Sequence, residues 1–191
     1  MRVITGTARG RVLKAVEGLD VRPTTDKVKE AVFSAVHFQL EGAKMLDLFC
    51  GSGQMGIEAL SRGAEVCVFV DKDRRSIEVT KQNLVSAGLF QKARVTQTDF
   101  QSYLTGCKDS FDIAFLDPPY SCGILQQALP LLVGKMNPSG VILCEHEEKD
   151  ILPDKVSSPD GTVVFCRTKK YRYARISVSA YRLDDSTGTE N

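Results

Sequence analysis

The sequence of 191 residues has no tryptophan and only two histidines, His37 and His146. Neither histidine has a cysteine at metal-ligand spacing, which argues against a zinc site, and no metal is expected. No apolar run approaches the roughly 20 residues that a membrane-spanning helix needs, and the N-terminus lacks the apolar core of a signal peptide. The six cysteines contain no Cys-x-x-Cys pair. We therefore expect reduced thiols in a cytoplasmic protein without a membrane partner.

An excess of charge of either sign is also lacking, because 25 Lys and Arg face 24 Asp and Glu. The basic residues are nevertheless concentrated near the two ends of the chain. Arg2, Arg9, Arg11 and Lys14 precede the first acidic residue. The second group consists of Arg167, Lys169, Lys170, Arg172, Arg175 and Arg182. Each group is as compatible with a solvated surface as with phosphate contacts, and together they are compatible with a nucleic-acid partner.

Alternating apolar runs and helical patterns predict an α/β fold. Five strands are expected at 45–50, 66–70, 94–97, 111–116 and 141–144, with helices between them and Pro130 kinking or dividing the last helix. Two more strands, at 163–166 and 175–181, are expected to form an antiparallel pair joined by the basic segment. The opening residues predict a hairpin, followed by a helix whose N-cap lies in 22–26.

These elements predict a Rossmann-like fold with a seven-stranded, mostly parallel sheet and an antiparallel last strand. One domain is expected over 1–183, including an N-terminal hairpin extension of about residues 1–22. Residues 184–191 are expected to be a disordered tail. Ligands of such folds bind outside the carboxyl ends of the strands, so the functional residues should follow the strands.

A glycine turn follows the first parallel strand. The segment Gly51-Ser52-Gly53-Gln54-Met55-Gly56 matches Gly-x-Gly-x-x-Gly, with Asp71 20 residues after Gly51, so a nicotinamide or flavin enzyme is one interpretation. Asp47, inside the preceding strand, favours instead a ligand with a cationic amino group, such as S-adenosylmethionine. Asp71 could then accept the ribose hydroxyls and Asp99 the adenine amino group, although either could simply cap a helix.

The segment Asp117-Pro118-Pro119-Tyr120 is expected where the fourth strand ends. An exocyclic amine on a base is a poor nucleophile, because its lone pair is delocalised into the ring. Hydrogen bonds from this amine to the Asp117 carboxylate and the Pro118 carbonyl would favour a tetrahedral, more nucleophilic nitrogen. The prolines stiffen the turn, and Tyr120 could stack on the base and orient it.

Methylation of a pyrimidine carbon through a cysteine nucleophile is an alternative. Cys144 lies near the end of the fifth strand, but no basic neighbour would lower its pKa and Glu145 would oppose ionisation. Cys50 is expected to pack under the glycine turn. Both cysteines are therefore interpreted as structural.

Two motifs carry a resemblance to known enzymes. The segment from Asp47 to Gly53 resembles the first motif of class I methyltransferases, and Asp71 and Asp99 match that family's ribose and adenine positions. The segment Asp117–Tyr120 resembles the motif of enzymes that methylate planar amino nitrogens. The resemblance implies S-adenosylmethionine as cofactor and contacts to it from Asp47, Phe49, Gly51, Ser52, Gly53, Asp71, Lys72, Asp99 and Phe100.

The N-terminal pattern narrows the resemblance further. Its residues Arg2 to Gly6, Arg9-Gly10-Arg11, Arg22-Pro23-Thr24 and Asp26 to Phe33 resemble the RsmD family, and the resemblance extends from about Arg2 to Tyr181. Those bacterial enzymes methylate guanine N2 in small-subunit (16S) ribosomal RNA. One departure is Tyr171-Arg172-Tyr173-Ala174-Arg175, where the family tends to have Tyr-Gly-x-Thr.

The resemblance implies an enzyme that methylates the guanine amine of ribosomal RNA, free or in a small-subunit assembly particle. RNA contacts are expected from Arg9, Arg11, Arg22, Thr24, Lys170 and Arg172. Two alternatives stay open. One is an amino-methyltransferase acting on adenine or cytosine of DNA or another RNA, and the other is a non-catalytic S-adenosylmethionine-binding factor in ribosome assembly.

Overall fold

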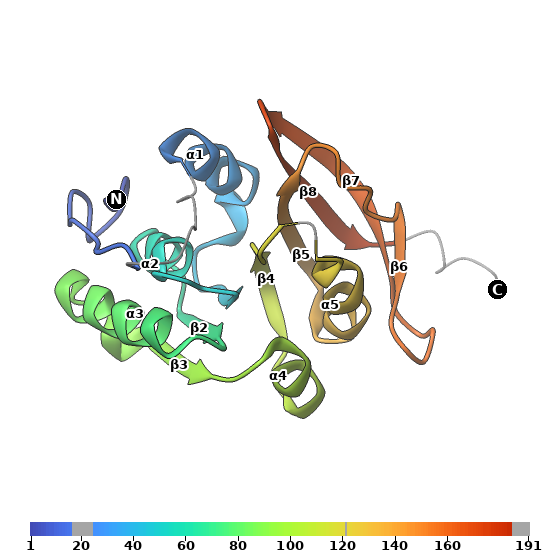
Figure 1. Cartoon of the computed structure of the whole chain (residues 1–191), viewed down its shortest axis with the longest axis horizontal. Helices are drawn as coiled ribbons and strands as arrows, with labels where there is room; N and C mark the ends of the chain where they lie inside the picture. The colour runs from blue at the N-terminus through green and yellow to red at the C-terminus, as the bar shows by residue number, and fades with distance from the viewer. Residues whose placement is uncertain (17–24, 121, 185–191) are drawn as a thin grey trace.

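One eight-stranded sheet runs through the residues that the computed structural model describes, which are 1–16, 25–120 and 122–184. Its strand order is β3-β2-β1-β4-β5-β8-β7-β6 (Figure 1). The strands are β1 (Lys44–Leu48), β2 (Val66–Asp71), β3 (Ala93–Gln97), β4 (Phe111–Leu116), β5 (Met136–Glu147), β6 (Lys155–Ser157), β7 (Val164–Tyr173) and β8 (Ile176–Leu183). The first five are parallel, whereas β8, β7 and β6 pair in antiparallel fashion.

The predicted fold class is confirmed, but the predicted count of seven strands is wrong. The additional strand, β6, has three residues of which only Val156 is buried, so it is too short to produce an alternating apolar pattern. The basic segment was expected to connect the last two strands. It lies instead inside β7, where Lys169 and Lys170 pair with Ala180 and Ser179 of β8. This strand is poorly buried and therefore carries cationic side chains without cost.

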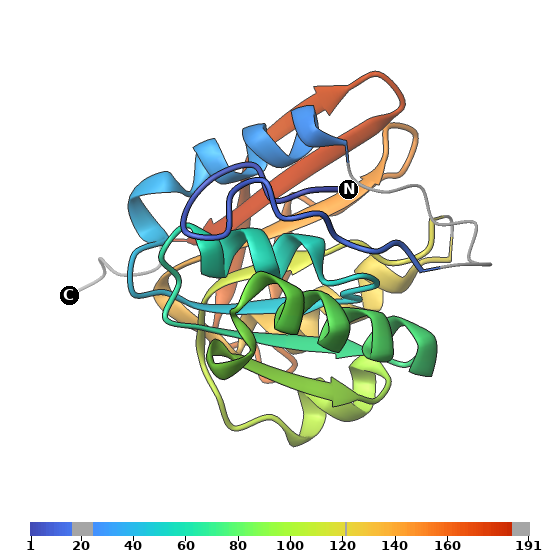
Figure 2. The same cartoon turned by 90° about the vertical axis from the view of Figure 1, so that its left-hand side faces the viewer.

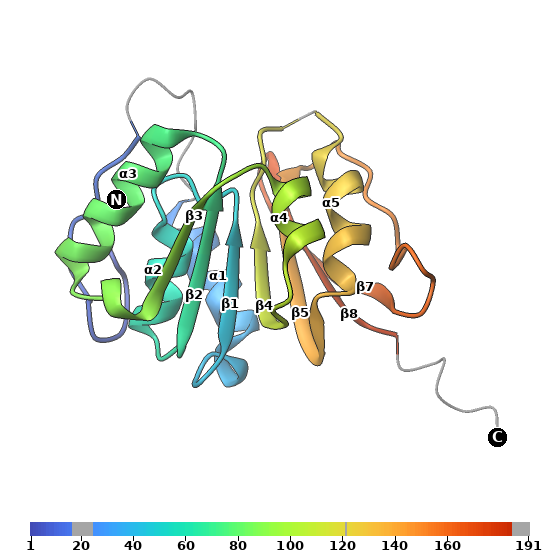
Figure 3. The same cartoon turned by 90° about the horizontal axis from the view of Figure 1, so that it is seen from below.

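Helices cover both faces of the sheet (Figure 3). They are α1 (Asp26–Ala35), α2 (Gln54–Ser61), α3 (Arg74–Ala87), α4 (Phe100–Gly106) and α5 (Ile124–Val133), with short 3₁₀ turns at His37–Gln39 and Phe90–Lys92. Side chains of α1, α2 and α3 share one apolar core with Met45, and those of α4 and α5 share another with Leu46 and Leu48. Thr25 caps α1 as expected, and α5 continues through Pro130 without division.

The N-terminal segment forms the short hairpin that was predicted: Arg2 bridges Val12, and the N–H groups of Val3 and Leu13 donate to the carbonyls of Arg11 and Met1, at 3.0 and 2.9 Å. This segment crosses the outside of α2 (Figure 2). The Glu58 carboxylate accepts hydrogen bonds from the backbone N–H groups of Ile4 and Thr5, at 2.8 and 3.0 Å. The segment is therefore fixed to α2 through buried polar contacts rather than through a strand ladder.

Asp184, which the sequence assigns to the tail, is tied to the sheet: its N–H donates to the Val164 carbonyl and its carboxylate pairs with Lys155. Residues 185–191 lie outside the described residues. Among the described helices, none is both long and apolar enough to span a membrane.

Candidate active site

Four acidic side chains gather at the carboxyl ends of neighbouring strands. They are Asp47 on β1, Asp71 on β2, Asp117 just after β4 and Glu145 on β5. Successive side chains of a strand point to opposite faces. The residues two positions before each acid (Met45, Phe69, Phe115 and Leu143) all belong to the core under α1–α3. The four acids therefore face the same side of the sheet.

The glycine turn lies between β1 and α2. Gly51 and Gly53 have φ values of 54° and 76°, in the left-handed region that glycine adopts most readily. The Gly51 N–H donates to the Asp71 carboxylate at 2.9 Å, and the Thr80 hydroxyl donates to the Gly51 carbonyl at 2.9 Å. A Cβ at Gly53 would approach the Thr80 side chain to 2.8 Å, whereas one at Gly51 would meet no atom within 4 Å. A ligand can therefore approach the backbone at Gly51.

Asn83 of α3 holds the same turn in place through its side-chain amide. Its amide donates to the carbonyls of Ser52 and Lys14, at 2.9 and 3.0 Å, and accepts from the Lys14 N–H at 2.8 Å. Ser52 also donates to the Met1 sulfur. The N-terminal segment and the glycine turn are thus bound to one another through a buried side chain.

Asp47 is a buried carboxylate, and its Oδ2 accepts a hydrogen bond from the Gly56 N–H at 2.9 Å. Burial raises the pKa of Asp47 to about 7 against the lowering effect of that bond, and the nearby Asp71 charge raises it further. A cation beside Asp47 would restore the ionised form. The site therefore fits the ammonium group of the methionyl end of S-adenosylmethionine.

Cofactor affinity should consequently depend on pH. Above pH 7 Asp47 is ionised, whereas below it the carboxyl must lose its proton before it can pair with an ammonium group. We expect the dissociation constant of S-adenosylhomocysteine to rise about tenfold per pH unit below pH 7 and to stay level between pH 7 and 8. Calorimetry across this range measures it. Asp47→Asn should bind weakly without this pH dependence, and an unchanged dependence in that variant would refute the assignment.

The residues predicted to hold the nucleoside part lie around the glycine turn. Asp71 is half-buried and accepts from the N–H groups of Gly51 and Asp73, so it shapes the turn and does not cap α3. Asp99 does cap α4, through the Ser102 N–H at 2.9 Å. The rings of Phe49 and Phe100 pack at 5.5 Å between centroids. Lys72 is exposed after β2. The structure thus brings Phe100 to the glycine turn, where it could pack on an adenine ring.

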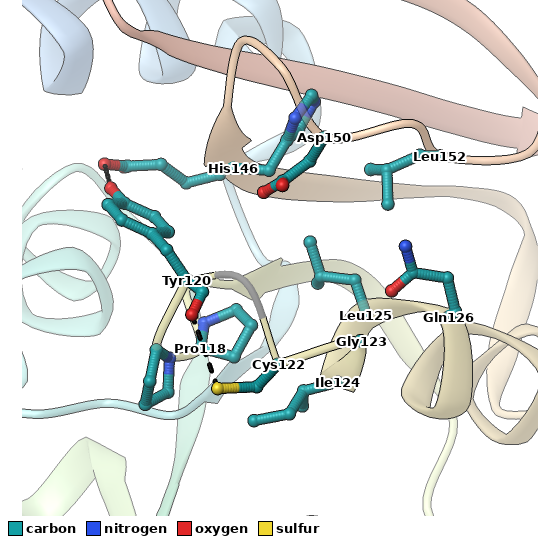
Figure 4. Close-up of a pocket in the computed structure, with 12 residues that line it drawn as sticks. Pro118, Tyr120, Cys122, Gly123, Ile124, Leu125, Gln126, His146, Asp150 and Leu152 are labelled. Atoms are coloured by element: carbon teal, nitrogen blue, oxygen red, sulfur yellow. Dashed lines mark hydrogen bonds between the residues drawn. The ribbon is translucent and has the colours of Figure 1, made fainter.

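The Asp117–Tyr120 turn borders a pocket that Pro118, Tyr120 and Glu145 line together (Figure 4). Burial raises the pKa of Asp117 well above its ordinary value, with further increases from the charges of Glu145 and Asp47. The Tyr120 hydroxyl donates to Glu145 Oε1 at 3.2 Å. Pro118 is buried under the turn, whereas Pro119 is exposed. The acidic turn after β4 therefore lies beside the glycine turn after β1, because these two strands pair directly.

Comparison with known proteins identifies the family. The family described as "Conserved hypothetical protein 95" matches residues 1–179. The chain belongs to this family. It is the RsmD family. A relative in Bacillus subtilis, "Putative rRNA methyltransferase YlbH", is 41% identical over 187 residues, which cover 95% of this chain and 98% of the relative. "Ribosomal RNA small subunit methyltransferase D" of Escherichia coli K12 is 35% identical over 157 residues, 80% of this chain and 78% of the relative.

Solved structures agree with this membership. "Putative methyltransferase yhhF" from Escherichia coli superposes with a TM-score of 0.81 at 30% identity, covering 96% of this chain and 98% of that one. A methylase from Haemophilus influenzae superposes with a TM-score of 0.76 at 29% identity, covering 94% and 96%. The fold is that of class I methyltransferases, which favours this interpretation of the glycine turn over the nicotinamide or flavin alternative.

Among the described residues, the predicted RNA contacts of this RsmD-family chain lie in two places. Arg9 and Arg11 are exposed on the N-terminal segment, whose Thr7 N–H donates to the Ser61 carbonyl at the C-terminal end of α2, away from the glycine turn. Arg22 and Thr24 lie outside the described residues.

Lys170 and Arg172 lie on β7, toward the end of the sheet where the candidate site is. Both pair with the Glu148 carboxylate, at 3.5 and 3.0 Å, and the Ser177 hydroxyl donates to it as well. A carboxylate thus lies among three donors that could instead bind a phosphate oxygen.

The two cysteines considered as nucleophiles are both buried in this RsmD-family fold. Burial raises the pKa of Cys50 and of Cys144, and the charges of Asp47 and Asp71 raise that of Cys50 further. Cys144 lies within β5 and packs in the core under α4 and α5, on the face opposite the four acids. Neither thiol forms a nucleophilic thiolate at neutral pH.

Glu145 belongs to the candidate site, although the sequence analysis did not predict it as a site residue. It is fully buried and lies within β5, directly after the apolar run 141–144. An acid directly after such a run was the available signal.

Proposed function

We propose that the protein transfers a methyl group from S-adenosylmethionine to the exocyclic N2 amine of a guanine in small-subunit ribosomal RNA. The observation that carries the proposal is that the Asp117–Tyr120 turn and the glycine turn lie at the same end of the sheet. They follow β4 and β1, which are neighbouring, directly paired strands. Membership of a family with ribosomal RNA methyltransferases supports RNA as substrate. A chain of the same fold is described in complex with S-adenosyl-L-homocysteine.

S-adenosylmethionine would supply an electrophilic methyl group on a sulfonium. The glycine turn would hold its amino-acid part, with Asp47 facing the ammonium, and Asp71, Asp99 and Phe100 would hold the nucleoside. The four acids at this end of the sheet favour a cationic ligand and disfavour a second anion.

Asp117 would accept a hydrogen bond from the target amine and so increase the electron density on its nitrogen. The raised pKa of Asp117 makes it a stronger proton acceptor than an ordinary aspartate, so the proton that the amine loses can pass to it. Tyr120 would pack on the base. Its hydroxyl bond to Glu145 fixes the ring before the base arrives. The base must leave its stack, or already lie in a loop, to enter.

Nucleosides of small-subunit RNA test this function. Cells without the protein should lack one N2-methylguanosine, and the native chain but not Asp117→Ala should restore it in mass spectrometry. A lost methyladenosine or methylcytosine would instead support the alternative amino-methyltransferase. Restoration by Asp117→Ala would remove Asp117 from the mechanism, whereas unchanged N2-methylguanosine in cells without the protein would support a non-catalytic assembly factor.

Lys170 and Arg172 of β7 should contribute to RNA binding through phosphate contacts. We expect Arg172→Ala, and separately Lys170→Ala, to weaken binding of small-subunit RNA about equally for all sequences. Each should reduce the slope of log affinity against log salt by about 1. A filter-binding titration at several salt concentrations measures this slope. An unchanged slope in both variants would exclude phosphate contacts at these two residues.

A further inference from the structure

Glu145 and Asp117 are cross-strand neighbours. Leu116 of β4 pairs in parallel register with Cys144 of β5, so the next residue on each strand is Asp117 and Glu145 respectively. Adjacent strands lie about 4.8 Å apart, and the charge of Glu145 acts on Asp117. Two carboxyl groups therefore lie side by side, and Glu145 lines the pocket together with Pro118 and Tyr120, which follow Asp117.

Two adjacent hydrogen-bond acceptors match the amine-bearing edge of guanine better than those of adenine and cytosine. The methylated amine of guanine lies next to N1–H, a second donor. The amines of adenine and cytosine lie next to a ring nitrogen that is an acceptor. A carboxylate placed beside the group that holds the amine therefore attracts guanine and repels the other two bases, because a lone pair would face a lone pair.

We infer that Glu145 selects guanine by accepting a hydrogen bond from its N1–H, beside the N2 amine that Asp117 holds. This inference rests on the proposed function, since it specifies how the same pocket recognises its base. The Tyr120 hydroxyl donates a hydrogen bond to Glu145 Oε1 and so orients the carboxylate. Burial of Glu145 strengthens its attraction to N1–H and its repulsion of a facing lone pair, so a base without N1–H is rejected.

Holding Tyr120 in place is the simpler role for Glu145, and the two roles give different results. A support for Tyr120 affects all bases alike, so its loss lowers every rate and leaves the preference among bases unchanged. A partner of N1–H affects only the preference for bases that carry this group. The ratio of kcat/KM between two bases therefore separates the roles.

The base 2-aminopurine provides the probe, because it keeps the amine of guanine and has an unprotonated N1. Small-subunit particles are reconstituted with RNA that carries either guanine or 2-aminopurine at the methylated position, once the mass spectrometry above has located it. We expect the native enzyme to prefer guanine by at least about 100-fold in kcat/KM. Glu145→Gln should reduce the preference to within about tenfold, since its amide can donate to the bare N1.

Two variants serve as controls. Glu147→Gln makes the same chemical change two residues further along β5, and it should keep the native preference. Tyr120→Phe removes the hydroxyl bond to Glu145, and it should lower the rates on both bases with the preference largely retained. Comparing ratios between variants cancels the different nucleophilicity of the two amines.

The outcomes distinguish this inference from the proposed function. Methylation of guanine N2 with no native preference over 2-aminopurine, or an equal preference in Glu145→Gln, would overturn the role of Glu145 alone. Methylation of adenine or cytosine would overturn both.

Discussion

Replacing Asp117 with alanine should lower the rate of methyl transfer to small-subunit RNA by about 10²–10³-fold. The carboxylate is the group that accepts the amine hydrogen bond, and no other part of the turn offers a negative charge there. Binding of S-adenosylhomocysteine should be retained, because Asp47 and the glycine turn are intact. Single-turnover transfer of a labelled methyl group measures the rate, and calorimetry measures binding.

Stability provides the control for this variant. Burial and the neighbouring acids raise the pKa of Asp117, so its ionised form destabilises the folded state at neutral pH. Asp117→Ala should therefore unfold at no lower denaturant concentration than the native chain. Asp117→Asn retains an acceptor oxygen without the charge and should show an intermediate rate. Full activity in the alanine variant would remove Asp117 from the mechanism.

Replacing Glu58 with alanine should lower the free energy of unfolding by about 3–5 kcal/mol. Glu58 is fully buried and accepts from the N–H groups of Ile4 and Thr5 and from the Arg62 guanidinium at 2.8 Å. The buried Lys29 ammonium lies 3.8 Å from the same carboxylate. Removing the acid leaves these donors without their partner in a region that excludes water. Urea titration followed by circular dichroism measures the loss.

Glu78→Ala is a matched control on a helix surface, where the Glu78–Arg74 pair is exposed. That pair should contribute little, so the control should unfold close to the native chain. A similar small loss for Glu58→Ala would mean that the N-terminal segment is not fixed by this carboxylate.

The parallel half of the sheet was predictable chiefly because β2 and β4 are apolar on both faces. The strand expected at 66–70 is Val66–Asp71, and the one at 111–116 is Phe111–Leu116. The antiparallel half was harder. The short β6 carries little apolar signal, and the cations of β7 resemble a connecting loop in sequence although they lie within a strand.

Single motifs located most of the candidate site, since the glycine turn and the Asp117–Tyr120 turn are contiguous in sequence. Glu145 could not be assigned in that way. Its role depends on the register that aligns Cys144 with Leu116, which only tertiary pairing defines. The partner of Lys170 and Arg172 was likewise hidden, because Glu148 reaches them from the turn after β5.

The chemistry proposed for the Asp117–Tyr120 turn is tested most directly by incubating purified protein with unmethylated small-subunit particles and S-adenosylmethionine that carries a deuterated methyl group. Mass spectrometry of the digested RNA should find the deuterated methyl on guanine N2 and on no other nucleoside. Label on a ring carbon or a ribose, or no label in RNA although S-adenosylmethionine binds, would contradict an amine methyltransferase.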